Sequence, residues 1–292
     1  MLALNWAQAI RGNHAVTLGL HERQVSLSGV QTRQIDLESI DSLARAFDED
    51  GIGMVVHTAG YTNVEECEAK PDLARHINVD LAANVAKACA KLNLPLVHIS
   101  TDHLFSGEAP LMTETGAVAP INVYGWTKAE AERQVLEAHP QALVIRTNFY
   151  GWGTSYRRSF SDVVIQGLRS GKEMTLFEDV FYTPILIEAA ANAVHELVEL
   201  NASGILHVVG DQRISKYEFG LRIAKEFGLD NGLIKSGLLA DQPTLTPRPH
   251  DMSLSNQKTC KLLGRKLGNV DEHLARLHQQ EQGGFVWEIR KL

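Results

Sequence analysis

Residues 94–100 form a short apolar run that ends in a hydroxyl side chain and leads directly into Thr101 and Asp102. A run of this length and composition is typical of a strand buried on both faces of a parallel sheet. Similar short runs, at residues 14–20, 34–37, 53–58, 142–146 and 204–209, alternate with segments of helical periodicity. Parallel neighbours need crossover helices of this kind between them. The sequence therefore predicts an α/β fold with an open parallel sheet.

The helical segments carry apolar residues every three or four positions. Residues 2–11 show this spacing and stop at Gly12, which suits a glycine cap. Residues 72–92 carry a longer stripe of the same kind. Both segments are therefore predicted to be amphipathic helices that cover the sheet.

The regular alternation ends at about residue 155, where shorter mixed pieces begin. Residues 233–250 contain three prolines and predict a loop. We therefore expect a first domain over residues 1–154 and a second, smaller lobe mainly over residues 155–292, with some segments returning to the first domain.

Tyr124 and Lys128 are four residues apart at the start of a predicted helix. Residues at this spacing share one helix face, so the phenol and the ammonium can point into one cleft. An ammonium beside a phenol favours the phenolate and lowers the tyrosine pKa, which makes the tyrosine a usable proton donor or acceptor. Thr101 lies at the carboxyl edge of its strand, where open α/β sheets place their sites. The ordinary alternative is a surface helix with a solvated lysine, and the strand before Thr101 favours a site.

Two sequence motifs carry a family resemblance. Residues 100–107 read Ser-Thr-Asp-His-Leu-Phe-Ser-Gly, and residues 120–128 read Pro-Ile-Asn-Val-Tyr-Gly-Trp-Thr-Lys. Together they resemble the extended short-chain dehydrogenase/reductases, and within them the dTDP-4-dehydrorhamnose reductase branch, whose pattern is Ser-Thr-Asp-Tyr-Val-Phe followed by Tyr-Gly-x-x-Lys. The resemblance implies a Rossmann-like, doubly wound parallel sheet with a smaller C-terminal substrate lobe.

The resemblance also implies an activity, the NAD(P)H-dependent reduction of a 4-keto nucleotide sugar. Tyr124 would protonate the new alkoxide, Lys128 would tune Tyr124 and hold the nicotinamide ribose, and Thr101 would fix the carbonyl. Related dehydratases carry Asp-Glu after this threonine, whereas Asp102-His103 stands here. We therefore expect no dehydration of a nucleotide-activated hexose.

Several further residues are assigned to the cofactor. The basic residues His21 and Arg23 end the strand over residues 14–20 and suit the extra phosphate of NADP, with a solvated strand end as the alternative. Asn78 resembles the family's helix asparagine near the active site, although it can equally bond to a neighbouring strand. The remaining residues of the expected dinucleotide site are Asp36, Leu37, Ala59, Gly60, Thr62 and Lys128. NADP(H) is the preferred cofactor and NAD(H) the alternative.

Three residues are assigned to the substrate. Asp102 follows Thr101, and Asn148 lies in the segment that leads to the second lobe, although its spacing differs from the family's Arg-x-x-Asn. Residues 248–254 are similar to the family's Arg-Pro-x-x-Ser-x-Leu, which places Arg248 to meet a nucleotide phosphate.

Net charge, apolar runs and cysteine spacing limit the kinds of partner and the compartment that we expect for this protein. A net charge of −7 argues against a nucleic-acid surface, which needs a basic stripe. No apolar run reaches the ~18 residues of a membrane span, and the opening residues lack the basic start of a signal peptide. Three separated cysteines, Cys67, Cys89 and Cys260, fit no metal spacing and suggest a reducing compartment. We expect a cytoplasmic protein whose partner is a nucleotide sugar, with no metal, and compatible with a homodimer.

The start of the chain departs from the family pattern. The family begins with an apolar strand and Gly-x-x-Gly-x-x-Gly, whereas Met1 already lies where the first helix starts and Ala3 occupies the third glycine position. The absent strand would lie centrally, between the strands expected at residues 14–20 and 53–58, so its loss leaves unpaired backbone groups on both sides. We expect either an N-terminally shortened reductase or a binding module that has abandoned the cofactor.

Two alternatives to a reductase follow from the same resemblance. A sugar-nucleotide epimerase uses the same three residues with a retained NAD. A non-catalytic binding or regulatory subunit, like the regulatory β subunit of methionine adenosyltransferase, uses the scaffold without the reaction.

Overall fold

A parallel four-stranded sheet forms the centre of the molecule. The computed structural model describes residues 1–21 and 23–292. The sheet has the order β10-β5-β4-β3 and consists of β3 (Val55–His57), β4 (Leu96–Ile99), β5 (Leu143–Arg146) and β10 (Gly204–His207). Every pairing in it is parallel. The predicted α/β fold with a parallel sheet is confirmed.

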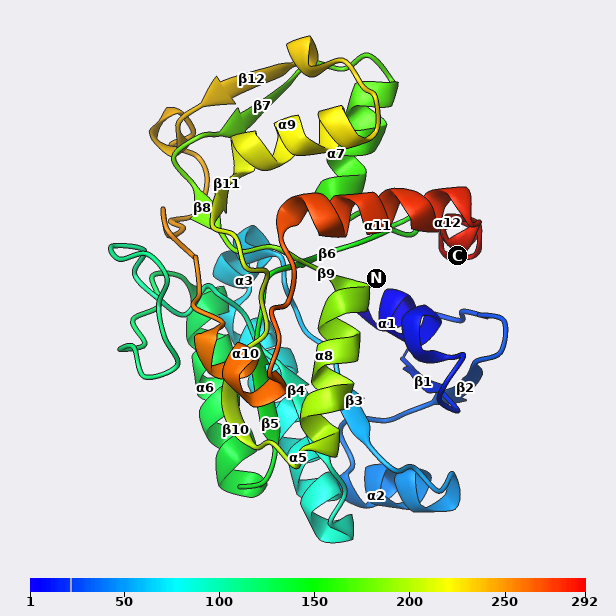
Figure 1. Cartoon of the computed structure of the whole chain (residues 1–292). Helices are drawn as coiled ribbons and strands as arrows, with labels where there is room; N and C mark the ends of the chain where they lie inside the picture. Colours follow the sequence, from blue (N-terminus) through cyan, green and yellow to red (C-terminus); the bar gives the residue numbers. More distant parts are fainter. Residues whose placement is uncertain (22) are drawn as a thin grey trace.

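Helices cover both faces of this sheet (Figure 1). One face packs on α2 (Ile40–Glu49), α5 (Leu81–Leu92) and α6 (Val123–Ala138). The other face packs on α1 (Leu2–Ile10) and α8 (Ile187–Glu199), and α10 (Gln257–Leu263) adds partly buried residues there. Consecutive residues of one strand point to opposite faces, so Leu96 joins the first core and Val97 the second. This arrangement is the predicted doubly wound sheet.

A second parallel pair, β1 (Thr17–Leu20) and β2 (Gln31–Gln34), stands apart from the main sheet. Within the described residues, β1 pairs only with β2 and β3 only with β4. The two strands expected on either side of the family's first strand, β1 and β3, are therefore not joined, in this part of the chain, by a strand between them. The strand expected at residues 34–37 is displaced, because β2 ends at Gln34 and Asp36 then accepts a hydrogen bond from the Glu38 N–H in a turn.

The helical stripe predicted over residues 72–92 is interrupted. It consists of α4 (Pro71–Arg75), a π-helical turn η1 (His76–Asp80) and α5, and the short helix α3 (Val64–Ala69) precedes it. The π turn contains Asn78, whose side chain bonds to Tyr61 in a neighbouring loop. Such turns are rare and frequently occur at functional sites.

The second lobe lies at the top of Figure 1 and has its own hydrophobic core. Its helices are α7 (Phe160–Arg169), α9 (Lys216–Glu226), α11 (Val270–Gln282) and α12 (Phe285–Arg290). Its short strands pair as β6 (Phe149–Tyr150) with β9 (Ile185–Leu186), β8 (Phe181–Tyr182) with β11 (Ile214–Ser215), and β7 (Met174–Phe177) with β12 (Ile234–Gly237). The segments α8 and β10 run back to the main sheet. The domain boundary near residue 154 stays a prediction.

The prediction of a loop over residues 233–250 is partly wrong. Residues Ile234–Gly237 form β12, which pairs in parallel with β7, and two short 3₁₀ turns, η2 (Asn231–Leu233) and η3 (Leu239–Asp241), flank it. Lys235 and Ser236 are exposed, so the strand lacks the apolar run that identified the others.

The first helix and the last helix are joined. The Gln8 side chain donates to the backbone oxygen of Phe285 at 2.9 Å, and Arg11 forms a 2.7 Å ion pair with Glu288. Across the described part of the chain, every helix is too short or too polar to cross a membrane.

Candidate active site

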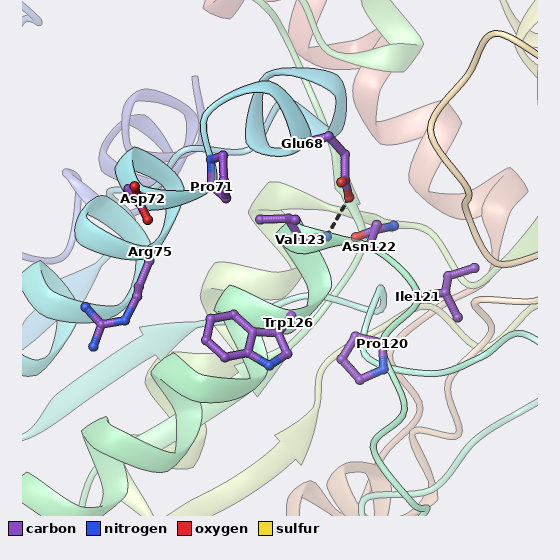
Figure 2. A pocket seen from close by; sticks show the side chains of 9 residues that line it. All are labelled: Glu68, Pro71, Asp72, Arg75, Pro120, Ile121, Asn122, Val123 and Trp126. Carbon is purple, nitrogen blue, oxygen red and sulfur yellow. Dashed lines mark hydrogen bonds between the residues drawn. The ribbon is translucent and has the colours of Figure 1, made fainter.

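The loop after β4 and the start of α6 meet at the candidate site. The Asn122 side chain caps α6 by accepting from the Gly125 N–H at 2.8 Å, and the Glu68 carboxylate accepts from the Val123 N–H at 2.7 Å (Figure 2). A Cβ atom on Gly125 would lie 2.3 Å from the backbone oxygen of His103. Only glycine therefore allows α6 to approach the loop that carries Thr101.

Thr101 and Tyr124 lie together, as the sequence predicted. Both side chains are buried, and the Thr101 hydroxyl interacts with the Tyr124 phenol. Burial raises the pKa of Tyr124 to about 12, against a smaller lowering by the bond to Thr101. Tyr124 is therefore a protonated phenol at neutral pH, and it can donate a proton to an oxygen beside it.

Lys128 is buried beneath this pair. Its ammonium donates to the backbone oxygen of Ile99 at 2.7 Å and lies 3.3 Å from Nε2 of His98. Burial lowers the pKa of Lys128 to about 8, and Glu132 opposes that shift. The expected lowering of the Tyr124 pKa by Lys128 is absent, because the ammonium is held on the strand side and burial dominates the phenol.

Asp102 and Asn148 are also brought together. Asp102 is fully buried, and its Oδ2 accepts a hydrogen bond from the Asn148 side-chain amide at 2.5 Å. Arg248 lies on a loop of the second lobe and forms an ion pair with Glu65 at the start of α3. Two of the three predicted substrate residues are therefore adjacent, and the third joins the two lobes.

Sequence reasoning missed two residues of this region. The His103 ring packs edge-on against Tyr124, with 5.5 Å between ring centroids. The Lys216 ammonium lies 3.3 Å from the centroid of the Tyr182 ring. Burial lowers the pKa of Lys216 to about 8, and the charge of Asp102 partly opposes that shift. Lys216 carried no recognisable signal, because it reads as the solvated first turn of a helix.

Six of the residues assigned to the cofactor, Arg23, Asp36, Leu37, Ala59, Gly60 and Thr62, follow β1, β2 and β3. Ala59 is exposed after β3, and Gly60 is close-packed, since a Cβ there would lie 3.2 Å from the Asn78 side-chain oxygen. Asp36 is exposed, and the backbone oxygen of Leu37 accepts a bond from Asn84. Small or exposed groups after three strands leave the backbone open to a ligand.

A segment of the second lobe reaches two of these residues. The Arg157 guanidinium donates to the Thr62 hydroxyl, and the Arg23 guanidinium lies 3.8 Å from the centroid of the Tyr156 ring. Arg23 and Thr62 are therefore held by the loop that precedes α7.

Asn78 is a structural brace in this geometry. Its side-chain oxygen accepts from the Tyr61 N–H at 2.7 Å, and its amide donates to the Tyr61 backbone oxygen at 3.0 Å and to the Thr127 hydroxyl at 2.9 Å. The expected bond to a neighbouring strand is replaced by bonds to the loop after β3 and to α6. These bonds fix α6 against the loop after β3.

The depression in Figure 2 lies at the start of the same helix but outside the candidate site. Its lining residues are Glu68, Pro71, Asp72, Arg75, Pro120, Ile121, Asn122, Val123 and Trp126. It contains none of the predicted site residues.

Among residues 1–21 and 23–292, three or more His, Cys, Asp or Glu side chains nowhere gather as a metal site requires.

The family follows from comparison with known proteins. The model of the RmlD substrate binding domain matches residues 12–282. The chain belongs to the RmlD family. This RmlD-family chain is an extended short-chain dehydrogenase/reductase that resembles dTDP-4-dehydrorhamnose reductase, as the two sequence motifs predicted.

Three relatives show the range of the family. The probable low-salt glycan biosynthesis reductase Agl14 of Haloferax volcanii is 31% identical over 83% of this chain and 83% of its own. Methionine adenosyltransferase 2 subunit beta of Rattus norvegicus is 28% identical over 84% of this chain and 74% of its own. The crystal structure of dTDP-4-dehydrorhamnose reductase from Bacillus anthracis in complex with NADP superimposes with a TM-score of 0.79 at 25% identity, over 86% of this chain and 90% of its own. The RmlD-family chain thus has both reductases and a subunit of another enzyme among its relatives.

Proposed function

We propose that this protein reduces a 4-keto nucleotide sugar with NAD(P)H. The observation that carries the proposal is the buried contact between the Thr101 hydroxyl and the Tyr124 phenol at the carboxyl end of β4. Two hydroxyls at one edge of a parallel sheet suit a substrate oxygen that gains negative charge during reaction. Similarity to Agl14 and to dTDP-4-dehydrorhamnose reductases supports this class of reaction.

The residues after β1, β2 and β3 would hold the dinucleotide, and the nicotinamide would supply the hydride. Thr101 then holds the carbonyl oxygen, and Tyr124 donates its proton to that oxygen as it becomes an alkoxide. The Tyr124 pKa of about 12 keeps the donor protonated before the reaction. Water would replace the proton that Tyr124 gives up, and Lys128, whose pKa burial lowers to about 8, would hold the nicotinamide ribose.

The protein's own residues fit a dinucleotide. Exposed Ala59 and Asp36 leave the ends of β3 and β2 open to a ligand. Arg23 ends the turn after β1, where a basic residue suits the additional phosphate of NADP, so NADP(H) is the preferred cofactor and NAD(H) the alternative. Binding at this edge requires the loop with Tyr156 and Arg157 to give up or share its contacts with Arg23 and Thr62.

Two cations on the second lobe support an anionic substrate. Lys216 and Arg248 both act electrostatically on His103, which packs against Tyr124. A nucleotide diphosphate held by Lys216 and Arg248 would bring its sugar to Thr101 and Tyr124.

A non-catalytic binding subunit is the second candidate. It is favoured by the loop that engages Arg23 and Thr62 and by similarity to methionine adenosyltransferase 2 subunit beta. An epimerase with retained NAD uses the same residues and predicts no net consumption of NADPH.

The decisive experiment follows NADPH consumption with a panel of 4-keto nucleotide sugars. Reduction of one of them, with product identified by mass spectrometry, is expected. Binding of a nucleotide sugar by calorimetry without turnover would favour the binding subunit. Interconversion of sugars without loss of NADPH would favour the epimerase.

A further inference from the structure

Three buried side chains form a row that crosses from α6 to β3. Nζ of Lys128 lies 3.3 Å from Nε2 of His98 on β4, and Nδ1 of His98 lies 3.1 Å from Nδ1 of His57 on β3. The two imidazole rings are stacked, with 5.3 Å between centroids. All three residues are less than 9% exposed. The row is separate from the contact between Thr101 and Tyr124.

Hydrogen-bonding chemistry fixes the protonation of the whole row. A lysine ammonium has donors only, so Nε2 of His98 must accept and carry no hydrogen. A neutral His98 then carries its hydrogen on Nδ1 and donates it to Nδ1 of His57. His57 in turn carries its hydrogen on Nε2, a buried atom that has no hydrogen-bond partner among the described residues.

We propose that His98 and His57 are positioning residues for Lys128. His98 holds the ammonium through Nε2, and His57 selects the tautomer of His98 that makes this possible. The inference rests on the proposed function only in that Lys128 serves the reaction. Its structural part concerns the protein without any ligand.

Among the described residues, no carboxylate competes with His98 for the Lys128 ammonium. Glu132 is bound by Arg146 in a buried ion pair with a 2.7 Å separation, and the described part of the chain places no carboxylate within 4 Å of Lys128. Burial lowers the pKa of His57 to about 3 and that of His98 well below its usual value, so both rings stay neutral beside the ammonium.

The first test measures the tautomers directly. In the ligand-free protein labelled with ¹⁵N-histidine, long-range ¹H–¹⁵N correlation spectra are expected to show His98 protonated on Nδ1 and His57 protonated on Nε2. His98 protonated on Nε2 would overturn the proposal, whether or not the protein turns over any substrate.

The second test measures the Lys128 pKa by NMR of its side-chain Cε and Nζ. His98→Leu removes the acceptor, and the Lys128 pKa is expected to fall by about one unit, the effect of a hydrogen bond to a charged group. His98→Gln keeps an acceptor and is expected to retain a pKa close to that of the wild type. His57→Leu is expected to lower the Lys128 pKa, and His57→Asn, which still accepts from His98, is expected to preserve it.

The two pairs of variants keep the test independent of folding. If His98→Leu does not fold, the comparison of His57→Leu with His57→Asn decides. Equal Lys128 pKa values within both pairs would overturn the proposal. In a working reductase, the alkaline limb of the pH–rate profile should move with the Lys128 pKa of each variant, whereas a purely structural role leaves it in place. Failure of the reductase assay alone leaves the NMR result standing.

Discussion

Tyr124 is a buried phenol with one side-chain hydroxyl beside it, and this environment decides what it can do. Burial stabilises the neutral form, so the group enters the reaction as an acid. Tyr124→Phe removes only the donated proton, and we expect turnover to fall ~10²-fold or more with cofactor binding nearly unchanged. Steady-state rates and calorimetric binding check this, with Trp126→Phe on the exposed face of the same helix as control. Equal turnover in both variants would remove the proposed role of Tyr124.

The residue pair after Thr101, Asp102-His103, predicts that the protein does not catalyse a 4,6-dehydration. A 4,6-dehydratase needs an acid and a base beyond the proton donor, and Asp102 is bound to Asn148 while His103 packs on Tyr124. Incubation with a nucleotide-activated hexose and NAD is expected to yield no 4-keto-6-deoxy sugar. Detection of that product by mass spectrometry would contradict the expectation.

The ion pair between Arg146 and Glu132 lies in the interior of the main domain. Both side chains are at most 5% exposed. Glu132→Gln leaves the guanidinium buried without its counter-charge, and we expect a loss of about 3–5 kcal/mol in the free energy of unfolding. Replacing both residues, as Glu132→Leu with Arg146→Met, should cost less than the single change. Urea denaturation measures this, and Arg133→Ala in an exposed ion pair should cost no more than about 1 kcal/mol.

At the scale of elements, β3 is an edge strand of the main sheet and pairs on one side only within the described residues. The Val55 N–H donates to the backbone oxygen of Pro95, on the side of β4. The Val56 N–H points to the opposite edge, where the described residues provide no paired strand. In hydrogen exchange, the Val56 amide should exchange on the order of tenfold or more faster than that of Val55. Val144, between two strands, serves as the protected control, and equal rates for Val55 and Val56 would show that the open edge is covered.

Elements with a local signal could be predicted from the sequence. The strands of the main sheet are buried apolar runs, and α1 and α5 are regular stripes, so each declares itself within its own residues. The strand β12 and the π turn at Asn78 could not be predicted, because pairing with β7 and the bonds to Tyr61 depend on distant residues. The contact of Thr101 with Tyr124 was predicted because two sequence motifs contain these residues. No motif marks the contact of His98 with Lys128, so that contact was not predicted. A histidine inside an apolar strand looks like a packed residue.

The whole molecule holds several neutral histidines in its interior. Burial lowers the pKa of His57 to about 3 and those of His195 and His207 to about 4. The unfolded chain binds protons at these groups below about pH 6.5 while the folded protein does not, so stability must fall as the pH decreases from about 6.5 to 4.

The slope of stability against pH measures this effect. Each of these histidines contributes up to about 1.4 kcal/mol per pH unit to the loss. Urea denaturation at pH 7, 6 and 5 should show it, and His195→Gln should remove one proton from the uptake on unfolding. A slope that is the same in His195→Gln and wild type would contradict the assignment.

The docking of the first helix has a consequence for biosynthesis. α1 packs against α8, and its residues Gln8 and Arg11 bond to the last helix, α12. On the ribosome α1 is made well before α8 and α12. Its apolar face therefore stays uncovered until α8 has been made, and its bonds to α12 form later still. Domains generally fold as units during synthesis, and this one cannot complete the packing of α1 before residues 187–199 and 285–290 have been made.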